Sequence, residues 1–317
     1  MAVRTNAVGG SSSVEFFTGL ARSRLLALYM AAAFAGAIYL IVAGYGTRFL
    51  VALVANLTLL ALYVAIVNIA TGGSGGRSYP VAHPRLETLV LLMYAVFLAI
   101  RATRRLAEFD LTGHLPFYRQ MDAAVVGAVQ AIVGGLAQGG QAPAGFYSAV
   151  SDGFWIFLVP VAMFLAMGYG PAKLGLTVSH WWVALPLILI AALPTILETL
   201  GAPVSGLPTL ANGALPTMLL AGLGLEFFYR GLLLSRVEAW RGRGLDALAV
   251  VGVVFALGQI PGLLATYGFD FTLVGAQTLM FAGAPTSLAW GYLYLRTRSL
   301  TPGILWHASP WAAFPFA

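Results

Sequence analysis

The sequence predicts an all-α protein, a polytopic transmembrane helical bundle of about 8–10 segments, each needing roughly 20 apolar residues to cross the hydrocarbon core. Of the 317 residues, 60% are hydrophobic and only 9% are charged, whereas a soluble domain carries about 25% charged residues. The apolar residues form long runs, and backbone groups in lipid must be satisfied within each segment, so we expect helices. A β-barrel would need segments of about 10 residues with alternating polarity, which the sequence lacks.

The apolar runs extend along most of the chain and approach or reach the length of a membrane span. They cover residues 25–42, 49–70, 86–100, 154–167, 181–197, 209–228, 247–265, 272–295 and 300–316. Residues 123–136 are apolar but short and Gly-rich, which leaves open a re-entrant rather than a spanning segment. Residues 101–120 are amphipathic and mixed in charge, which favours an interfacial segment. Residues 71–84 are predicted to be a loop by their Gly, Ser and Pro content.

Composition also excludes several functions and suggests the cellular location. The chain contains no cysteine, so disulfides, thiolate metal sites and cysteine nucleophiles are excluded. The net charge of +6 is carried by Arg apart from Lys173, a bias that with the Ala and Gly richness suggests a prokaryotic source. No basic patch is interleaved with aromatics, so we expect no nucleic-acid partner. We therefore expect a multi-pass protein of a prokaryotic cell membrane, in contact with membrane lipids.

Basic residues in the C-terminal half predict its orientation. They cluster in two connections, as Arg236, Arg241 and Arg243 and as Arg296 and Arg298. The intervening connections at 204–208 and 267–271 contain no Arg or Lys. Because Arg clusters belong on the cytoplasmic side, the C-terminus is predicted on the non-cytoplasmic side. The basic residues of the N-terminal half give no orientation.

A few polar residues lie within the apolar runs, where ionisable groups are costly and are therefore candidates for function. They are Glu226, Arg230, Gln259 and His307, with Glu198 near a predicted helix end where it can reach interfacial water. Glu226 and Arg230 are four residues apart, the favourable order for a pair on one helical face. This pair is either an internal ion pair that holds helices together or a catalytic carboxylate oriented by an arginine.

Gln259 alone would be an interhelical hydrogen-bonding residue, and His307 a structural residue or a cofactor ligand. Together, however, the three segments resemble the CPBP family, the CAAX-processing and bacteriocin-processing intramembrane proteases. Leu225-Glu226-Phe-Phe-Tyr-Arg230-Gly resembles the family's first motif, Glu-Glu-x-x-x-Arg. Phe-x-x-x-Gln259 resembles the second, Phe-x-x-x-His, and His307-x-x-x-Trp311 resembles the third, His-x-x-x-Asn or Asp.

The resemblance implies a division of the chain. Residues 1–22 are a polar lead, residues 23–145 form N-terminal transmembrane helices outside the family pattern, and residues 146–317 form a CPBP-like transmembrane core. It also implies site residues, Glu226, Arg230, Gln259 and His307, and it requires no metal and no cofactor. In the family, the first Glu and the second-motif His are thought to activate water, and the other His and the Asn stabilise the oxyanion.

This chain departs from the family at three of those positions, which are Leu225, Gln259 and Trp311. General-base assistance is typically worth about 10²–10⁴ in rate, and one oxyanion-hole donor roughly 10²–10³. Leu accepts no proton and Gln does not titrate. The first hypothesis is therefore a catalytically inactive relative of this family that serves as a scaffold or accessory subunit of a membrane complex.

Under this hypothesis the complex is a pigment-binding or energy-transducing one, and the partners are other membrane-protein subunits. The protein would then bind lipid or pigment, and His307 would coordinate a metal or chlorin. The second hypothesis is an active CPBP-type endopeptidase that uses Glu226 as its base. The third is a transporter, because segments interrupted by Gly and Pro, such as 281–285, resemble discontinuous helices. Few buried charges and no inverted repeat speak against the third hypothesis.

Overall fold

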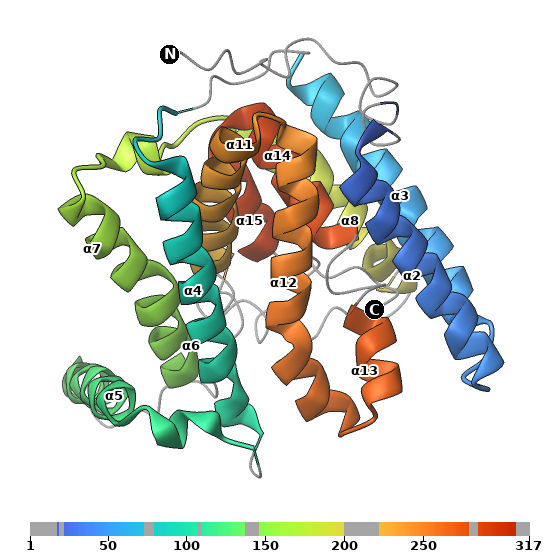
Figure 1. Ribbon diagram of the computed structural model, residues 1–317. Coiled ribbons are helices and arrows are strands. Elements are labelled where there is room, and N and C mark those ends of the chain that lie inside the picture. Colours follow the sequence, from blue (N-terminus) through green and yellow to red (C-terminus); the bar gives the residue numbers. More distant parts are fainter. Residues whose placement is uncertain are drawn as a thin grey trace.

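The computed structural model describes residue 18 and residues 22–72, 79–106, 109–136, 146–199, 222–278 and 285–308, with side chains described except at 133–136, 193–199 and 285–286. Within these ranges the protein is helical and contains no strand. Among the described residues, five helices are long and apolar enough to cross a membrane: Arg24–Val42, Arg48–Ala70, Pro84–Arg105, Phe146–Ala166 and Gly244–Tyr267. The predicted polytopic helical bundle is confirmed (Figure 1).

The first two helices form an antiparallel pair. Helix α2 (Arg24–Val42) begins after Ser23, whose side chain accepts a hydrogen bond from the Leu26 amide and caps the helix, as a serine at this position commonly does. Helix α3 (Arg48–Ala70) follows after a short turn. Gly44 and Gly46 have φ of +87° and +89° in this turn, a conformation that only glycine adopts readily. The glycines thus allow the chain to reverse between two spans.

The interfacial segment predicted at 101–120 corresponds to the end of one helix and the start of another. Helix α4 (Pro84–Ala102) is followed by the short 3₁₀ turns η1 (Thr103–Arg105) and η2 (Leu111–His114), and then by α5 (Pro116–Leu136). Figure 1 shows α5 almost end-on, whereas α4, α7 and α12 run up the picture, so α5 lies across the bundle. Helix α5 is also not among the five described helices with the length and composition of a span.

The next span begins earlier than its predicted start at 154. It is a continuous helix made of α6 (Phe146–Gly153), the π-helical η3 (Phe154–Leu158) and α7 (Val159–Ala166). Polar residues Ser151 and Asp152 interrupt the apolar pattern in α6, but both pair with Arg101 at 2.6 Å. Their pairing explains why the helix includes them. The short turns η4 (Pro171–Leu174) and η5 (Trp181–Val183) lead into α8 (Ala184–Thr199).

The C-terminal part contains the three motif segments. Its elements are η7 (Glu226–Leu234), α11 (Ser235–Arg241), α12 (Gly244–Tyr267), α13 (Phe271–Gln277), α14 (Pro285–Thr297) and α15 (Thr301–Ala308). The predicted segment 272–295 corresponds to α13 and α14, on either side of 279–284, which lie outside the described residues. Most of the predicted segment 209–228 and residues 309–316 also lie outside them.

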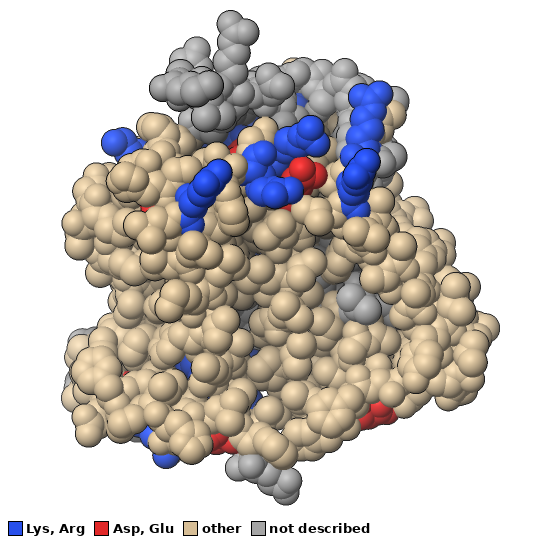
Figure 2. All heavy atoms as spheres, viewed as in Figure 1, with Lys and Arg blue, Asp and Glu red and all other residues tan. Residues whose placement is uncertain are grey.

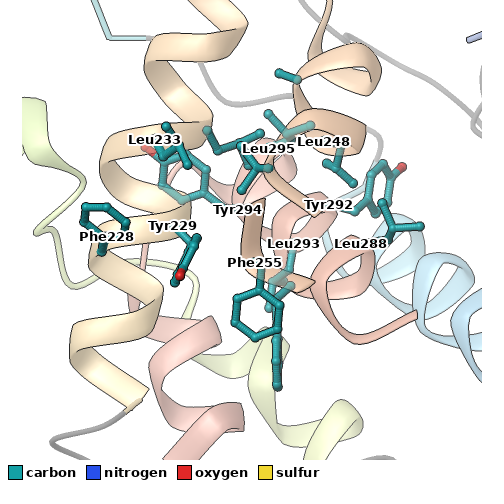
Figure 3. Close-up of a cluster of buried hydrophobic side chains, with 14 of the residues drawn as sticks. Phe228, Tyr229, Leu233, Leu248, Phe255, Leu288, Tyr292, Leu293, Tyr294 and Leu295 are labelled. Carbon is teal, nitrogen blue, oxygen red and sulfur yellow. The ribbon is translucent and has the colours of Figure 1, made fainter. Parts of the chain in front are cut away.

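A hydrophobic core joins the motif segments to each other and to the N-terminal helices. Figure 3 shows Phe228 and Leu233 of η7, Leu248 and Phe255 of α12, and Tyr292 of α14 in one cluster. Side chains from α2, α3 and α4 belong to the same cluster, among them Leu26, Leu60 and Leu91, each at most 2% exposed. The N-terminal helices therefore pack directly on the part of the chain that carries the motifs.

Polar contacts join helix ends that are far apart in sequence. Ser23 donates to Asp246 at 2.8 Å, which joins the starts of α2 and α12. Arg236 of α11 pairs with Glu87 of α4 at 3.2 Å, with both side chains 1% exposed. Because Glu87 also accepts from Tyr169 at 2.5 Å, its carboxylate is paired on both oxygens, as burial of a charge requires.

The arginine clusters of the C-terminal half lie at one end of the bundle. Glu238 of α11 accepts from both terminal nitrogens of Arg298, at 2.5 and 2.8 Å, which joins the two arginine-bearing connections. Tyr45 and Asp270 are hydrogen-bonded at the opposite end, between the α2–α3 and α12–α13 turns. Figure 2 shows Lys and Arg gathered at the upper end, above a broad uncharged band. This band is the surface expected to face lipid.

Candidate functional site

The first motif is built on an unusual helical segment. Residues 226–234 form a π-helix that begins at Glu226 and is nine residues long. Such turns are rare, are mostly single turns inside α-helices and occur often at functional sites. The glycine after Arg230 has a steric reason, because a Cβ at Gly231 would lie 3.0 Å from the Leu174 carbonyl oxygen.

Glu226 lies at the centre of a buried cluster. It is 1% exposed, and its Oε1 is 3.6 Å from Arg230 Nη1 and 3.3 Å from His307 Nδ1. Helix α15 approaches this carboxylate closely at Gly303, where a Cβ would be 2.6 Å from Glu226 Oε2. The predicted contact between Glu226 and Arg230 is present, and His307 joins it.

Arg230 is held by aromatic rings more than by hydrogen bonds. Its guanidinium carbon is 4.8 Å from the ring centroid of Phe255, 5.2 Å from that of Trp290 and 5.8 Å from that of Tyr229. One terminal nitrogen donates to Ser287 Oγ at 3.4 Å, while Nε and Nη1 have no hydrogen-bond partner among the described residues. Cation–π attraction and the charge of Glu226 therefore compensate a fully buried guanidinium.

The imidazole of His307 is fixed on two sides. Its ring stacks on that of Trp290 with centroids 4.2 Å apart and an interplanar angle of 8°, and its Nδ1 faces Glu226. The side chain is 17% exposed. His307 is thus oriented by a carboxylate and an indole, an arrangement that could serve a structural or a chemical role.

A cavity of about 160 Å³ lies beside this cluster, between α4, η3, η7 and α12. Leu225, Tyr229, Gly258 and Gln259 form part of its lining, and Glu226 is not among the described residues that line it. Gln259 makes no hydrogen bond to Glu226 or His307 within the described ranges. Glu226, Arg230 and His307 are therefore brought together, whereas Gln259 and Leu225 line the cavity.

Part of the lining of this cavity is charged, and the sequence does not predict that part as a site. It contains Arg101, Arg104 and Arg105 of α4 and η1, together with Asp152 of α6. Arg101 pairs with Asp152 at 2.6 Å, and Arg104 with Asp122 at 3.2 Å. Two sequence features could have pointed to this charged lining. They are the basic run at 101–105 and the polar pair Ser151-Asp152 within an apolar segment. Their meeting depends on how α4 and α6 pack, which the sequence pattern does not specify.

Three further candidates are a metal site, Trp311 and Glu198. Within the described ranges no group of three or more His, Asp or Glu residues is arranged to hold a metal ion. Trp311 lies outside the described residues, and so does the side chain of Glu198.

This architecture is that of a multi-pass helical membrane protein with a buried Glu–Arg–His cluster next to a cavity. Residues 207–310 match the family model of the type II CAAX prenyl endopeptidase Rce1-like proteins, a stretch that contains Glu226, Gln259 and His307. The predicted resemblance to the CPBP family is thereby confirmed over about a third of the chain. No curated protein and no solved structure matches the chain.

Proposed function

We propose that the protein is a catalytically inactive relative of the CPBP intramembrane proteases, acting as a scaffold or accessory subunit of a membrane complex in a prokaryotic cell membrane. The observation that carries the proposal is the lining of the cavity. The two family positions that would activate water, Leu225 and Gln259, are on its wall, and neither side chain can take up a proton at neutral pH.

The retained carboxylate does not replace the missing one. Glu226 is 1% exposed and is enclosed by Arg230, His307 and the α15 backbone at Gly303. A general base must lie within about 2.6–3.2 Å of the proton that it abstracts, or reach it through one water. Because its charge is already compensated by a buried arginine, Glu226 acts in this proposal as a structural group that joins η7 to α15.

The N-terminal helices supply the surface for the proposed scaffold role. Helices α2 and α3 expose large apolar side chains such as Leu28, Val42, Val51 and Ile69, between 65% and 81% exposed. In a membrane these side chains contact lipid or other membrane-protein subunits. Under this proposal the C-terminus lies on the non-cytoplasmic side, because the arginine-rich end of the bundle faces the cytoplasm.

One contact favours a second candidate function, an active endopeptidase. Glu226 Oε1 and His307 Nδ1 are 3.3 Å apart, and a carboxylate that orients an imidazole is a common arrangement in catalysis. In that case His307 would have to present its other nitrogen to a water that enters from the cavity side.

Incubation of the purified protein with prenylated peptides and with membrane peptides distinguishes the two candidates. The proposal predicts that wild type and Glu226→Gln give the same background of product. Cleavage by wild type that disappears in Glu226→Gln, with both proteins monodisperse in detergent, would establish the endopeptidase instead.

A further inference from the structure

Helix α5 has two exposed sides of different chemistry. We propose that α5 lies in the plane of the membrane interface, with its apolar side against acyl chains and its polar side at the lipid headgroups. The polar side carries Arg119 and Gln130. The apolar side comprises Phe117, Ala124, Ala128 and Ile132. This placement goes beyond the proposed function, because it does not depend on whether the protein catalyses hydrolysis.

The spans on either side of α5 end on the same side of the membrane. Arg101, near the end of span Pro84–Arg105, pairs at 2.6 Å with Asp152, near the start of span Phe146–Ala166. A connection that starts and finishes on one side crosses the bilayer an even number of times or not at all. Crossing twice would need a second spanning helix besides α5.

The rest of the connection is too short for that second helix. Residues 106–115 and 137–145 are stretches of at most ten residues, about 15 Å as a helix, which is half of the roughly 30 Å of a hydrocarbon core. Helix α5 is itself uninterrupted from Pro116 to Leu136, so it does not turn back within the membrane as a re-entrant segment would. It therefore neither crosses the bilayer nor dips into it and returns.

The third side of α5 is fixed to the bundle. Tyr118 is 5% exposed, and its ring centroid is 5.9 Å from that of Phe97 and 5.1 Å from that of Trp155. Asp122 accepts from Trp155 Nε1 at 2.8 Å and pairs with Arg104 at 3.2 Å. Tyr118 and Asp122 lie about one turn apart on the helix, so their contacts determine which sides of α5 face outward.

Helix geometry places the apolar and polar sides almost opposite each other. Successive residues of an α-helix are turned by about 100°, so the four residues of the apolar side fall within an arc of about 80° and the two of the polar side within about 20°. Gln120 and Gly127 lie between the two sides, facing away from the bundle. On the apolar side Phe117 is 73% exposed and Ile132 is 61% exposed. A helix divided in this way suits the boundary between headgroups and acyl chains.

The level of α5 in the bundle agrees with such a boundary. Figure 1 shows α5 across the lower end of the bundle, and Figure 2, in the same view, shows charged side chains again below the broad uncharged band. Because that band is the surface expected to face lipid, the outward sides of α5 meet the edge of the bilayer rather than its centre.

The test is power-saturation EPR of nitroxide-labelled single-cysteine variants in phosphatidylcholine liposomes. The chain has no native cysteine, so Ala128→Cys carries one label on the apolar side and Gln130→Cys one on the polar side. Oxygen partitions into the hydrocarbon, whereas a nickel chelate stays in water. Met93→Cys is the matched reference for lipid contact, because Met93 is 74% exposed and lies midway along α4.

We expect the label of Ala128→Cys to collide more with oxygen than with the nickel chelate, at a depth of about 5–10 Å. The label of Met93→Cys should lie deeper, near the centre of the roughly 30 Å core. The label of Gln130→Cys should show the opposite preference, for the nickel chelate. Nickel access at both α5 positions would place the helix in water, oxygen preference at both would bury it in the membrane, and exclusion of both reagents would indicate a protein contact. Each of these three results would overturn the proposal.

Discussion

Leu225 and Glu226 are neighbours in the chain but face different surroundings. Leu225 lines the cavity between α4 and α12, while Glu226 is turned into a buried cluster with Arg230 and His307. The site therefore separates the place where a substrate could enter from the one carboxylate that the motif retains. This separation underlies the proposed loss of catalysis.

The buried ion pair should be strongly coupled. Removal of one partner of a buried pair typically costs about 3–5 kcal/mol, because it leaves an uncompensated charge. We expect Glu226→Gln and Arg230→Met each to lower the free energy of unfolding in detergent by an amount of this order. The double variant should lose less than the sum of the two, because neither charge is then unpaired. Additive losses would contradict the pairing.

The close approach of α15 to Glu226 predicts an effect at a glycine. Gly303→Ala would place a methyl group 2.6 Å from Glu226 Oε2, so we expect it to destabilise the protein and lower the thermal unfolding midpoint. Gly275→Ala on α13 is the control, because nothing lies within 4 Å of its Cβ. The control should be neutral or slightly stabilising, since Ala is the better helix former. Equal effects would show that α15 does not pack against Glu226.

The contact between the α2–α3 and α12–α13 turns should depend on pH. The hydrogen bond from Tyr45 lowers the pKa of Asp270, with a smaller contribution from the Leu273 amide. A lowered pKa in the folded state gives stability above the unfolded value of about 3.9, which is lost as pH falls through the folded pKa. The unfolding midpoint of wild type minus that of Tyr45→Phe should therefore shrink on acidification below about pH 4. A difference that is constant from neutral to acid pH would contradict this linkage.

The two ends of α12 give a direct test of orientation. The chain has no native cysteine, so Arg243→Cys and Thr266→Cys each introduce a single thiol at an exposed position. With the arginine-rich end in the cytoplasm, a membrane-impermeant maleimide should label Thr266→Cys in intact cells and Arg243→Cys only after lysis. The reverse pattern would invert the predicted topology and place the C-terminus inside.

The sequence predicts the contact within one helix of this site but not the contacts between helices. The contact between Glu226 and Arg230 follows from spacing along one helix, and it is present although the segment is π-helical. The placement of Gln259 on the cavity, which Glu226 does not line among the described residues, depends on how η7 and α12 are rotated against each other. Likewise, Arg101 and Asp152 are 51 residues apart, and no local pattern predicts their contact.

If the cavity wall does not support hydrolysis, the protein should not incorporate oxygen from water into a cleaved peptide. The purified protein is incubated with prenylated peptides in ¹⁸O-labelled water, and mass spectrometry measures label in the new carboxylate of any product. We expect the same background incorporation for wild type and for folded Glu226→Gln. Incorporation by wild type that Glu226→Gln abolishes would contradict the proposed loss of catalysis and would identify Glu226 as the base of an active protease.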